Sequence, residues 1–215
     1  MNQEDLQNLR RDYSLAQLSE TTVNNNPIKQ FELWFHEAVE AELYEPNAMT
    51  LATATRDGVP SARIVLLKGY DNYGFTFYTN YLSRKGKEIT KNPLGAITFF
   101  WGELERQVRI EGTIEKLSKE VSDRYFQTRP KNSQLGALVS PQSQEIAGRE
   151  ILENKMNELE AEYADKTIPK PSYWGGYILK PRMIEFWQGQ SSRLHDRIVY
   201  KKIDNTTWKK VRLAP

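Results

Sequence analysis

Between Ala48 and Leu117 the sequence is a succession of short runs rich in β-branched and aromatic residues, and this succession limits the possible folds more than any other feature. Each run has the length of a strand. Most gaps between the runs are too short for the crossover helix that parallel neighbours need, so the pattern favours an antiparallel barrel. Asp57-Gly58 provides the first turn. The runs cover residues 49–55, 61–67, 74–79, 96–101 and 107–115.

Helical patterns flank this β-rich region. Asn26 can cap a helix that begins at Pro27. Further helices are predicted near residues 83–91, at 118–128 and at 143–163, and strands return from Tyr173 to the end. We therefore expect a mainly β protein with flanking helices, of the α+β class. The first helix has one apolar face, made by Ile28, Phe31, Trp34, Phe35, Ala38 and Val39.

A chain of 215 residues favours one compact domain, which we place at residues 27–215. Residues 1–26 are polar and end in three asparagines, which is typical of a mobile arm. No apolar run approaches the roughly 18 residues of a membrane span, and the polar start lacks the regions of a signal peptide. The cytoplasm is the expected location, without a membrane partner.

Charge and composition exclude several kinds of site. The formal net charge is only +2, too small for the field of a protein that coats nucleic acid. Without cysteine there is no thiolate or disulfide, and with two histidines there is no multi-histidine metal site. Redox chemistry would therefore need a borrowed cofactor, and no metal is expected.

Three expected helix starts carry polar or cationic residues suited to an anion, because free N–H groups and the positive end of the helix dipole gather there. They are Ser83-Arg84-Lys85, Asn132-Ser133 and Gln142-Ser143. Each serine or asparagine could equally serve only as a cap. Tyr125 and Arg129 share a helix face just before Pro130, and they could hold a phosphate or merely stack at the surface.

The strongest local pattern is Arg193-Leu194-His195-Asp196-Arg197. In a regular strand Arg193, His195 and Arg197 would share one side, where two guanidinium groups and an imidazole repel each other unless an anion faces them. The preceding residues 184–188 add a large aromatic surface. An anion site is the favoured interpretation, and a solvated strand face is the alternative.

The segment Ile184-Glu-Phe-Trp-Gln188, followed by Arg193-Leu-His-Asp-Arg197, resembles the signature of the pyridoxamine 5′-phosphate oxidases. Further segments match that family in order, and the resemblance runs from Leu9 to the end of the chain. It implies an FMN-binding split antiparallel β-barrel that forms a homodimer with FMN at the subunit interface. The further segments are residues 63–68, 78–79, 83–86, 107, 125–133, 142–143 and 212–215.

Carried over residue by residue, the resemblance assigns a role to each matching position. The FMN phosphate would be held by Arg63, Arg84, Lys85, Gln142 and Ser143. The flavin ring system would be lined or contacted by Ile64, Val65, Leu66, Leu67, Tyr78, Thr79, Gln107, Trp187 and Arg197. Substrate would be bound by Arg10, Tyr13, Lys68, Tyr125, Arg129, Ser133, Arg193, Leu194 and His195, with Lys68 also beside FMN and with Arg193 and His195 as the catalytic pair.

One geometric difficulty accompanies these roles. Arg63 and Lys68 are five residues apart, so a regular strand would point them to opposite faces. Serving one cavity would require a bend, a bulge or a strand end between them.

The activity implied by the resemblance is oxidation of pyridoxamine or pyridoxine 5′-phosphate by O2 to pyridoxal 5′-phosphate and H2O2, with ammonia released from the amine. The flavin would accept the electrons, and the protein would position the reactants and stabilise the charge that develops on them. A flavin- or pyridoxal phosphate-binding protein without turnover is one alternative, since fold does not fix activity. A nucleic-acid-binding module is another, and steeply salt-dependent binding would favour it.

Overall fold

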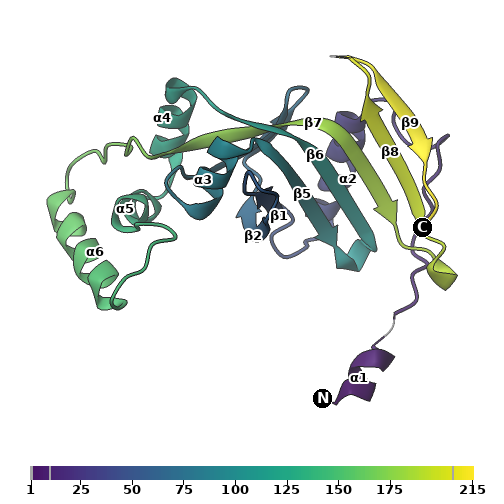
Figure 1. Ribbon diagram of the computed structural model, residues 1–215, viewed down its shortest axis with the longest axis horizontal. Coiled ribbons are helices and arrows are strands. Elements are labelled where there is room, and N and C mark those ends of the chain that lie inside the picture. The colour runs from purple at the N-terminus through teal and green to yellow at the C-terminus, as the bar shows by residue number, and fades with distance from the viewer. Residues whose placement is uncertain (1, 10, 205) are drawn as a thin grey trace. The chain divides into compact units, whose positions relative to one another are not determined.

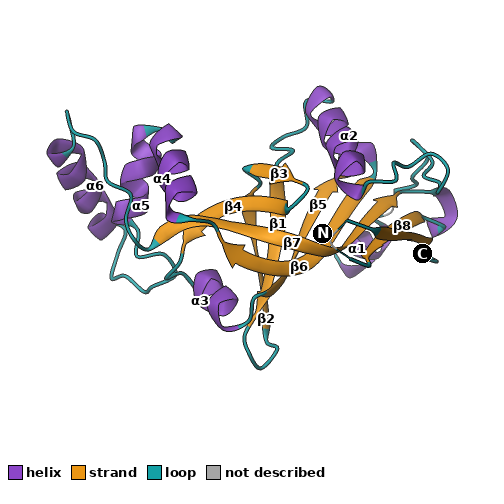
Figure 2. Cartoon of the chain, turned by 90° about the horizontal axis from the view of Figure 1, so that it is seen from above, coloured by secondary structure: helices purple, strands orange, loops and turns teal. Residues whose placement is uncertain are grey.

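The computed structural model describes residues 2–9, 11–204 and 206–215 (Figures 1 and 2). The helices and strands follow one another as α1 (Gln3–Asn8), α2 (Pro27–Glu40), β1 (Ala48–Ala54), β2 (Pro60–Leu66), β3 (Gly69–Asp71), β4 (Gly74–Asn80), α3 (Arg84–Lys91), β5 (Leu94–Trp101), β6 (Arg106–Lys116), α4 (Lys119–Thr128), α5 (Lys131–Val139), α6 (Glu150–Glu162), β7 (Trp174–Gln188), β8 (Asp196–Lys202) and β9 (Trp208–Arg212). Short 3-10 helices lie at Gly102–Leu104 and Ser191–Arg193.

Within the described residues, nine strands form one sheet in the order β2-β1-β5-β6-β7-β4-β3, with β8 paired to β7 and β9 to β8. The pairs β3–β4, β4–β7, β7–β8 and β8–β9 are antiparallel. Every predicted β-rich run falls on a strand, which confirms the antiparallel, mainly β expectation. Among the residues that the structure describes, no helix is long and apolar enough to span a bilayer.

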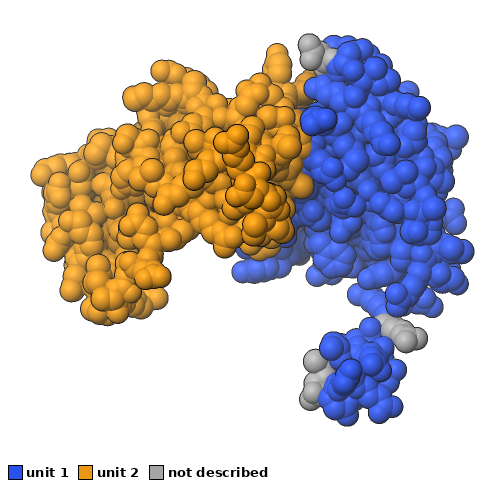
Figure 3. Space-filling view, in the orientation of Figure 1, with its two compact units in different colours: residues 1–50, 97–111, 181–215 blue, residues 51–96, 112–180 orange. Residues whose placement is uncertain are grey.

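The chain divides into two compact units (Figure 3). Unit 1 comprises residues 1–50, 97–111 and 181–215, and unit 2 comprises residues 51–96 and 112–180. Both units are discontinuous in sequence, so each is assembled from distant segments. The expectation of a single domain at residues 27–215 stays a prediction, as does mobility of residues 1–26.

In unit 1, helix α2 forms as the sequence predicts. The Asn26 side chain accepts hydrogen bonds from the N–H groups of Ile28 and Lys29, and Pro27 occupies the first turn. Trp34 packs edge-on against Phe186, with their ring centroids 5.2 Å apart. Val39 departs from the predicted apolar face, because it lies near the C-terminal end of the helix and is exposed.

Residues 13–23 of unit 1 make specific contacts with that unit. The backbone N–H groups of Ser14 and Leu15 both donate to Oε2 of Glu105, at 2.8 and 3.0 Å. Leu18 and Val23 are buried. These hydrogen bonds and apolar contacts fix the path of this segment before it reaches α2.

In unit 2, helices α4, α5 and α6 gather around a small core made by Phe126, Leu135, Leu159, Ile168 and Trp174. Ser83 caps α3, which is one of the two roles expected of it, and Ser118 caps α4. The long helix was expected from residue 143 but begins at Glu150. Ser143 has a positive φ of 69°, which a helix does not accept, so residues 143–149 form a loop.

Candidate functional site

A cavity of about 500 Å³ in unit 2 brings together most of the residues predicted to hold FMN and the substrate phosphate. It lies among β2, β4, α3, α4 and α5 and the loop that follows α5. Its size is within the range of small-ligand sites. The predicted residues that line it are Arg63, Ile64, Val65, Leu66, Lys68, Tyr78, Thr79, Lys85, Tyr125, Arg129, Ser133 and Gln142.

The position of Lys68 shows how one segment supplies two cations to this cavity. Strand β2 ends at Leu66, before Lys68 is reached. The backbone N–H of Lys68 donates to the carbonyl of Thr76, 2.8 Å away, as the chain turns into β3. Of the three ways in which Arg63 and Lys68 could serve one cavity, the structure uses the strand end.

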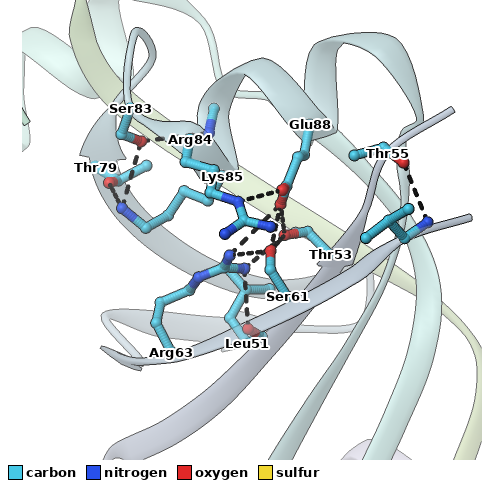
Figure 4. Close-up of polar contacts among 12 residues, drawn as sticks. Leu51, Thr53, Thr55, Ser61, Arg63, Thr79, Ser83, Arg84, Lys85 and Glu88 are labelled. Carbon is cyan, nitrogen blue, oxygen red and sulfur yellow. Dashed lines mark hydrogen bonds and ion pairs between the residues drawn. The ribbon is translucent and has the colours of Figure 1, made fainter. Parts of the chain in front are cut away.

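Arg63 is held at the edge of the cavity by a buried carboxylate (Figure 4). Oε2 of Glu88 accepts hydrogen bonds from the hydroxyl groups of Thr53 and Ser61, at 2.5 and 2.6 Å, and lies 3.5 Å from Nη2 of Arg63. Its Oε1 accepts from Nε of Arg84 at 2.9 Å. Burial opposes ionisation of Glu88, but the hydrogen bonds outweigh it and lower the pKa to about 2.

The Arg63 guanidinium has further fixed partners. Its Nη1 donates to the Leu51 carbonyl at 3.1 Å and to Oγ1 of Thr53 at 2.5 Å, and its Nη2 donates to Ser61. Burial lowers the pKa of Arg63, while Glu88 raises it. These contacts hold the guanidinium in one orientation before any ligand arrives.

Lys85 is a buried cation whose hydrogen-bond partners among the described residues are all neutral. Its Nζ donates to Oε1 of Gln142 at 2.9 Å, to Oγ1 of Thr79 at 3.2 Å and to Oγ of Ser83 at 3.3 Å. Burial, with a contribution from the nearby Arg63, lowers the pKa of Lys85 to about 8. Such an ammonium group favours an anion in contact with it.

Arg129 lies where α4 ends and α5 is about to begin. Its guanidinium stacks on Trp174, 4.7 Å from the ring centroid. Tyr125 stacks on Tyr78 with ring centroids 3.8 Å apart. Burial lowers the pKa of Arg129. Among the described residues, Nη1 of Arg129 is buried without a hydrogen-bond partner, so the guanidinium retains a donor for a ligand in the cavity.

Three predicted FMN contacts in unit 2 lie outside this cavity. Leu67 is buried. Arg84 and Ser143 line a neighbouring cavity of about 860 Å³. Gln142-Ser143 is also not a helix start, so the expected contribution of a helix dipole there is wrong. Asn132-Ser133, in contrast, falls within the first turn of α5.

Unit 1 gathers a second group of predicted residues. The rings of Trp187 and His195 lie 4.6 Å apart, and Tyr13 packs edge-on against both at 5.8 Å. The backbone N–H of Gln190 donates to Nδ1 of His195 at 3.1 Å. Gln107 is half-buried on β6. Arg10, also predicted here, lies outside the described residues.

The predicted strand face of Arg193, His195 and Arg197 is wrong. Arg193 closes a 3-10 helix and has a positive φ of 61°, and Leu194 is exposed, so strand alternation does not apply. Strand β8 begins only at Asp196. Arg197 lies on β8 and forms a two-pronged ion pair with the buried Glu185, with both N···O distances 3.0 Å.

Sequence reasoning missed three residues that organise these groups. Glu88 is four residues after Arg84 on α3, a spacing that could have suggested the pair. Trp174 supplies the surface on which Arg129 stacks. Gln190 lies in a stretch without a motif, so no local pattern pointed to its contact with His195.

Comparison with protein families gives two matches. The model described as pyridoxamine 5′-phosphate oxidase matches residues 35–163. The model described as the pyridoxine 5′-phosphate oxidase C-terminal dimerisation region matches residues 174–215. Together these matches cover the cavity of unit 2 and the Trp187–His195 pair.

Several relatives are similar over nearly their full length. A pyridoxine/pyridoxamine 5′-phosphate oxidase from Nostoc punctiforme is 58% identical over 207 residues, covering 96% of this chain and 97% of the relative. One from Salinibacter ruber is 55% identical, covering 98% and 99%. The solved structure of PhzG from Burkholderia lata 383, in complex with tetrahydrophenazine-1-carboxylic acid, has a TM-score of 0.87 at 33% identity and covers 94% of this chain and 100% of that chain.

Proposed function

Because the chain belongs to the pyridoxamine 5′-phosphate oxidase family, we propose that it is an FMN-dependent oxidase that makes pyridoxal 5′-phosphate. Its substrates are pyridoxamine 5′-phosphate and pyridoxine 5′-phosphate, with O2 as the electron acceptor. The products are pyridoxal 5′-phosphate and H2O2, and the amine substrate also consumes water and releases ammonia.

One observation carries this proposal. The buried Nη1 of Arg129 has no hydrogen-bond partner among the described residues and faces a cavity that Lys68 and Ser133 also line. A buried donor without a partner is costly unless a ligand satisfies it. A phosphate monoester fits this combination of guanidinium, ammonium and hydroxyl groups.

The same cavity offers a separate set of cations for the FMN phosphate. Arg63 and Lys85 line it, and Gln142 and Thr79 orient the Lys85 ammonium. Arg84 is linked to this set through Glu88, and Ser143 follows Gln142 directly. Two phosphate groups in one site require several cations, and the residues present provide them.

The residues of unit 1 have the remaining roles in this proposal. Trp187, Gln107 and Arg197 contact the flavin ring system, while Arg193 and His195 orient the substrate ring and stabilise charge on its oxygen. Tyr13 covers the substrate, which its packing against Trp187 and His195 supports. When bound, FMN supplies the two-electron acceptor for the hydride leaving the substrate C4′ carbon and passes the electrons to O2.

The site is completed by a second copy of the chain. Residues 174–215 match a dimerisation region, which supports a homodimer. We place FMN at the interface between the two copies. This arrangement allows one chain to supply the phosphate-binding cavity and its partner to supply residues next to the flavin ring.

An anaerobic absorbance titration of the purified protein with pyridoxamine 5′-phosphate tests this function. We expect the flavin band to bleach, to return when air is admitted, and to be accompanied by pyridoxal 5′-phosphate and H2O2. Pyridoxamine without its phosphate is the matched control ligand, and it should bleach the band only at far higher concentration because Arg129 and Lys68 then lack their anion.

Two other outcomes would contradict the proposal. A yellow protein unchanged by either phosphorylated substrate would favour a flavin-binding protein without turnover. A colourless protein that neither takes up added FMN nor turns over would remove FMN from the proposal.

A further inference from the structure

The hydrogen bond between Gln190 and His195 determines which nitrogen of the imidazole carries the proton. The backbone N–H of Gln190 is the donor, and Nδ1 of His195 is the acceptor at 3.1 Å. An imidazole nitrogen can accept a hydrogen bond from an N–H group only if its lone pair is free, that is, if it carries no proton. A neutral imidazole has one proton, so that proton is on Nε2.

Gln190 is itself held from two sides. Its side-chain Nε2 donates to the Ala16 carbonyl at 2.5 Å and to Oδ2 of Asp196 at 2.9 Å. Asp196 also accepts from the Leu18 N–H at 3.0 Å and from Nη1 of Arg212 at 2.6 Å. The backbone N–H that faces His195 is therefore fixed by contacts with the N-terminal segment and with β8 and β9.

The imidazole ring is also fixed in orientation. Trp187 packs at 4.6 Å with a tilt of 45°, and Tyr13 packs edge-on at 5.8 Å. Within the described residues, Nε2 of His195 makes no hydrogen bond, whereas Nδ1 is occupied by Gln190. The nitrogen that is left to meet a ligand is the protonated one.

We propose that Gln190 is a positioning residue that holds His195 in the Nε2–H tautomer, so that His195 donates a hydrogen bond to the substrate instead of accepting its proton. The group that accepts this hydrogen bond is an oxygen substituent on a pyridine ring. This oxygen becomes more negative when it loses its own proton, and the bond then becomes stronger. The role in turnover rests on the proposed function, whereas the tautomer is a property of the protein alone.

Nitrogen-15 NMR of the imidazole tests the tautomer directly. The chain has two histidines, and His36 is exposed on α2, where its Nδ1 lies 3.2 Å from Oε1 of Glu40. A His36→Gln variant therefore leaves a single histidine and an unambiguous spectrum. It is recorded on the FMN-loaded protein at a pH where imidazoles are generally neutral.

The expected spectrum has a protonated Nε2 and an unprotonated Nδ1. A protonated Nδ1, or two nitrogens with the same averaged shift, would overturn the proposal. This result does not depend on activity, so an inactive protein with the Nε2–H tautomer would contradict only the proposed function.

A Gln190→Ala variant in the His36→Gln background tests the part played by Gln190. The loss of its bonds to Ala16 and Asp196 should loosen the loop and shift the spectrum toward a mixture of tautomers. Gln17→Ala is the matched control, because Gln17 is an exposed glutamine that directly follows Ala16 in the N-terminal segment, and it should leave the spectrum unchanged. An unchanged spectrum in Gln190→Ala would remove the positioning role from this side chain.

Two amide replacements at His195 separate a donor from a base. Glutamine places an amide N–H near the Nε2 position, and asparagine places it near Nδ1, but neither amide is a base. If His195 is a donor, turnover by His195→Gln should stay within on the order of tenfold of the parent and well above that of His195→Asn. Equal losses on the order of 100- to 10,000-fold in both variants would indicate a base and overturn the donor role.

Discussion

The Nζ of Lys85, in the first turn of α3, lies 2.9 Å from Oε1 of Gln142, in the loop after α5. Within the part of the chain that the structure describes, the other two hydrogen-bond partners of this ammonium group are the hydroxyl groups of Thr79 and Ser83. None of the three is charged, so the positive charge is oriented without being neutralised. A bound phosphate would supply the missing negative charge.

The pH dependence of FMN binding should report the charge of Lys85. Burial lowers its pKa to about 8 in the free protein, and a phosphate in contact with it would raise that pKa again. A phosphate monoester has its second pKa near 6, so the ligand is already fully charged at this pH. We expect the FMN dissociation constant to increase by up to about tenfold per pH unit above pH 8.

Flavin fluorescence titrations between about pH 7 and 10 measure this effect. Lys85→Met should bind FMN more weakly and lose this component of the pH dependence. A parent protein whose affinity does not change across this range would show that Lys85 does not contact the phosphate.

Lys85 should also make the ligand-free protein more stable at alkaline pH. Its pKa is about 8 in the folded state and 10.5 as the ordinary value, so between these values the unfolded chain binds more protons. The free energy of unfolding should therefore rise with pH in this window, by at most about 1.4 kcal/mol per pH unit. Urea unfolding of the parent and of Lys85→Met checks this, and the variant should lack the increment.

Glu88→Gln should destabilise unit 2. The carboxylate of Glu88 accepts four hydrogen bonds or ion pairs, including those from Arg63 and Arg84. The amide leaves the half-buried Arg63 without its counter-charge, which should lower the free energy of unfolding by about 2 kcal/mol. The lost ion pair with Arg84 adds little to this, because Arg84 is largely exposed. Glu153→Gln, in an exposed ion pair with Arg149, is the control and should change stability by less than about 0.5 kcal/mol.

Unfolding by acid gives a second measurement of the contribution of Glu88 to stability. Its pKa is lowered from 4.5 to about 2, so its contribution to stability is complete above about pH 5 and is lost as the pH falls toward 2. The Glu88→Gln variant should lack this component. A parent and a variant with the same acid unfolding midpoint would contradict the role of Glu88.

Arg129→Lys should raise the KM for pyridoxamine 5′-phosphate by on the order of 10- to 100-fold and leave FMN affinity unchanged. A lysine lacks the planar group that stacks on Trp174 and offers no two-pronged contact to phosphate. Arg124→Lys, at an exposed arginine of the preceding helix α4, is the control for charge and should behave like the parent. Equal kinetic constants for all three proteins would place the substrate phosphate elsewhere.

Gly189→Ala should displace the N-terminal segment from its contact with Trp187 and His195. A methyl group on Gly189 would lie 2.7 Å from Cβ and Cγ of Tyr13, closer than carbon atoms can approach. Hydrogen exchange of residues 13–18 should accelerate and turnover should fall, while FMN still binds. Gly69→Ala is the control, because its methyl group would meet only Cβ of Thr76 at 3.9 Å.

The local sequence pattern was sufficient to predict most of the backbone. Runs of β-branched and aromatic residues placed the strands, and Asn26 and Ser83 each cap the helix at whose start they were placed. These features depend on neighbours within a few residues, which is why they can be read along the chain. The resemblance in residues 184–197 then identified the family.

Tertiary structure decided which side chains meet. It brought Lys68 to the cavity of Arg63 through the end of β2, and it moved the start of the expected helix from Ser143 to Glu150. It also placed Gln190 opposite His195 in a loop where strand alternation had been expected. Local periodicity describes a residue relative to its neighbours in sequence, whereas contacts such as Lys85–Gln142 join segments 57 residues apart and form only when the whole chain packs.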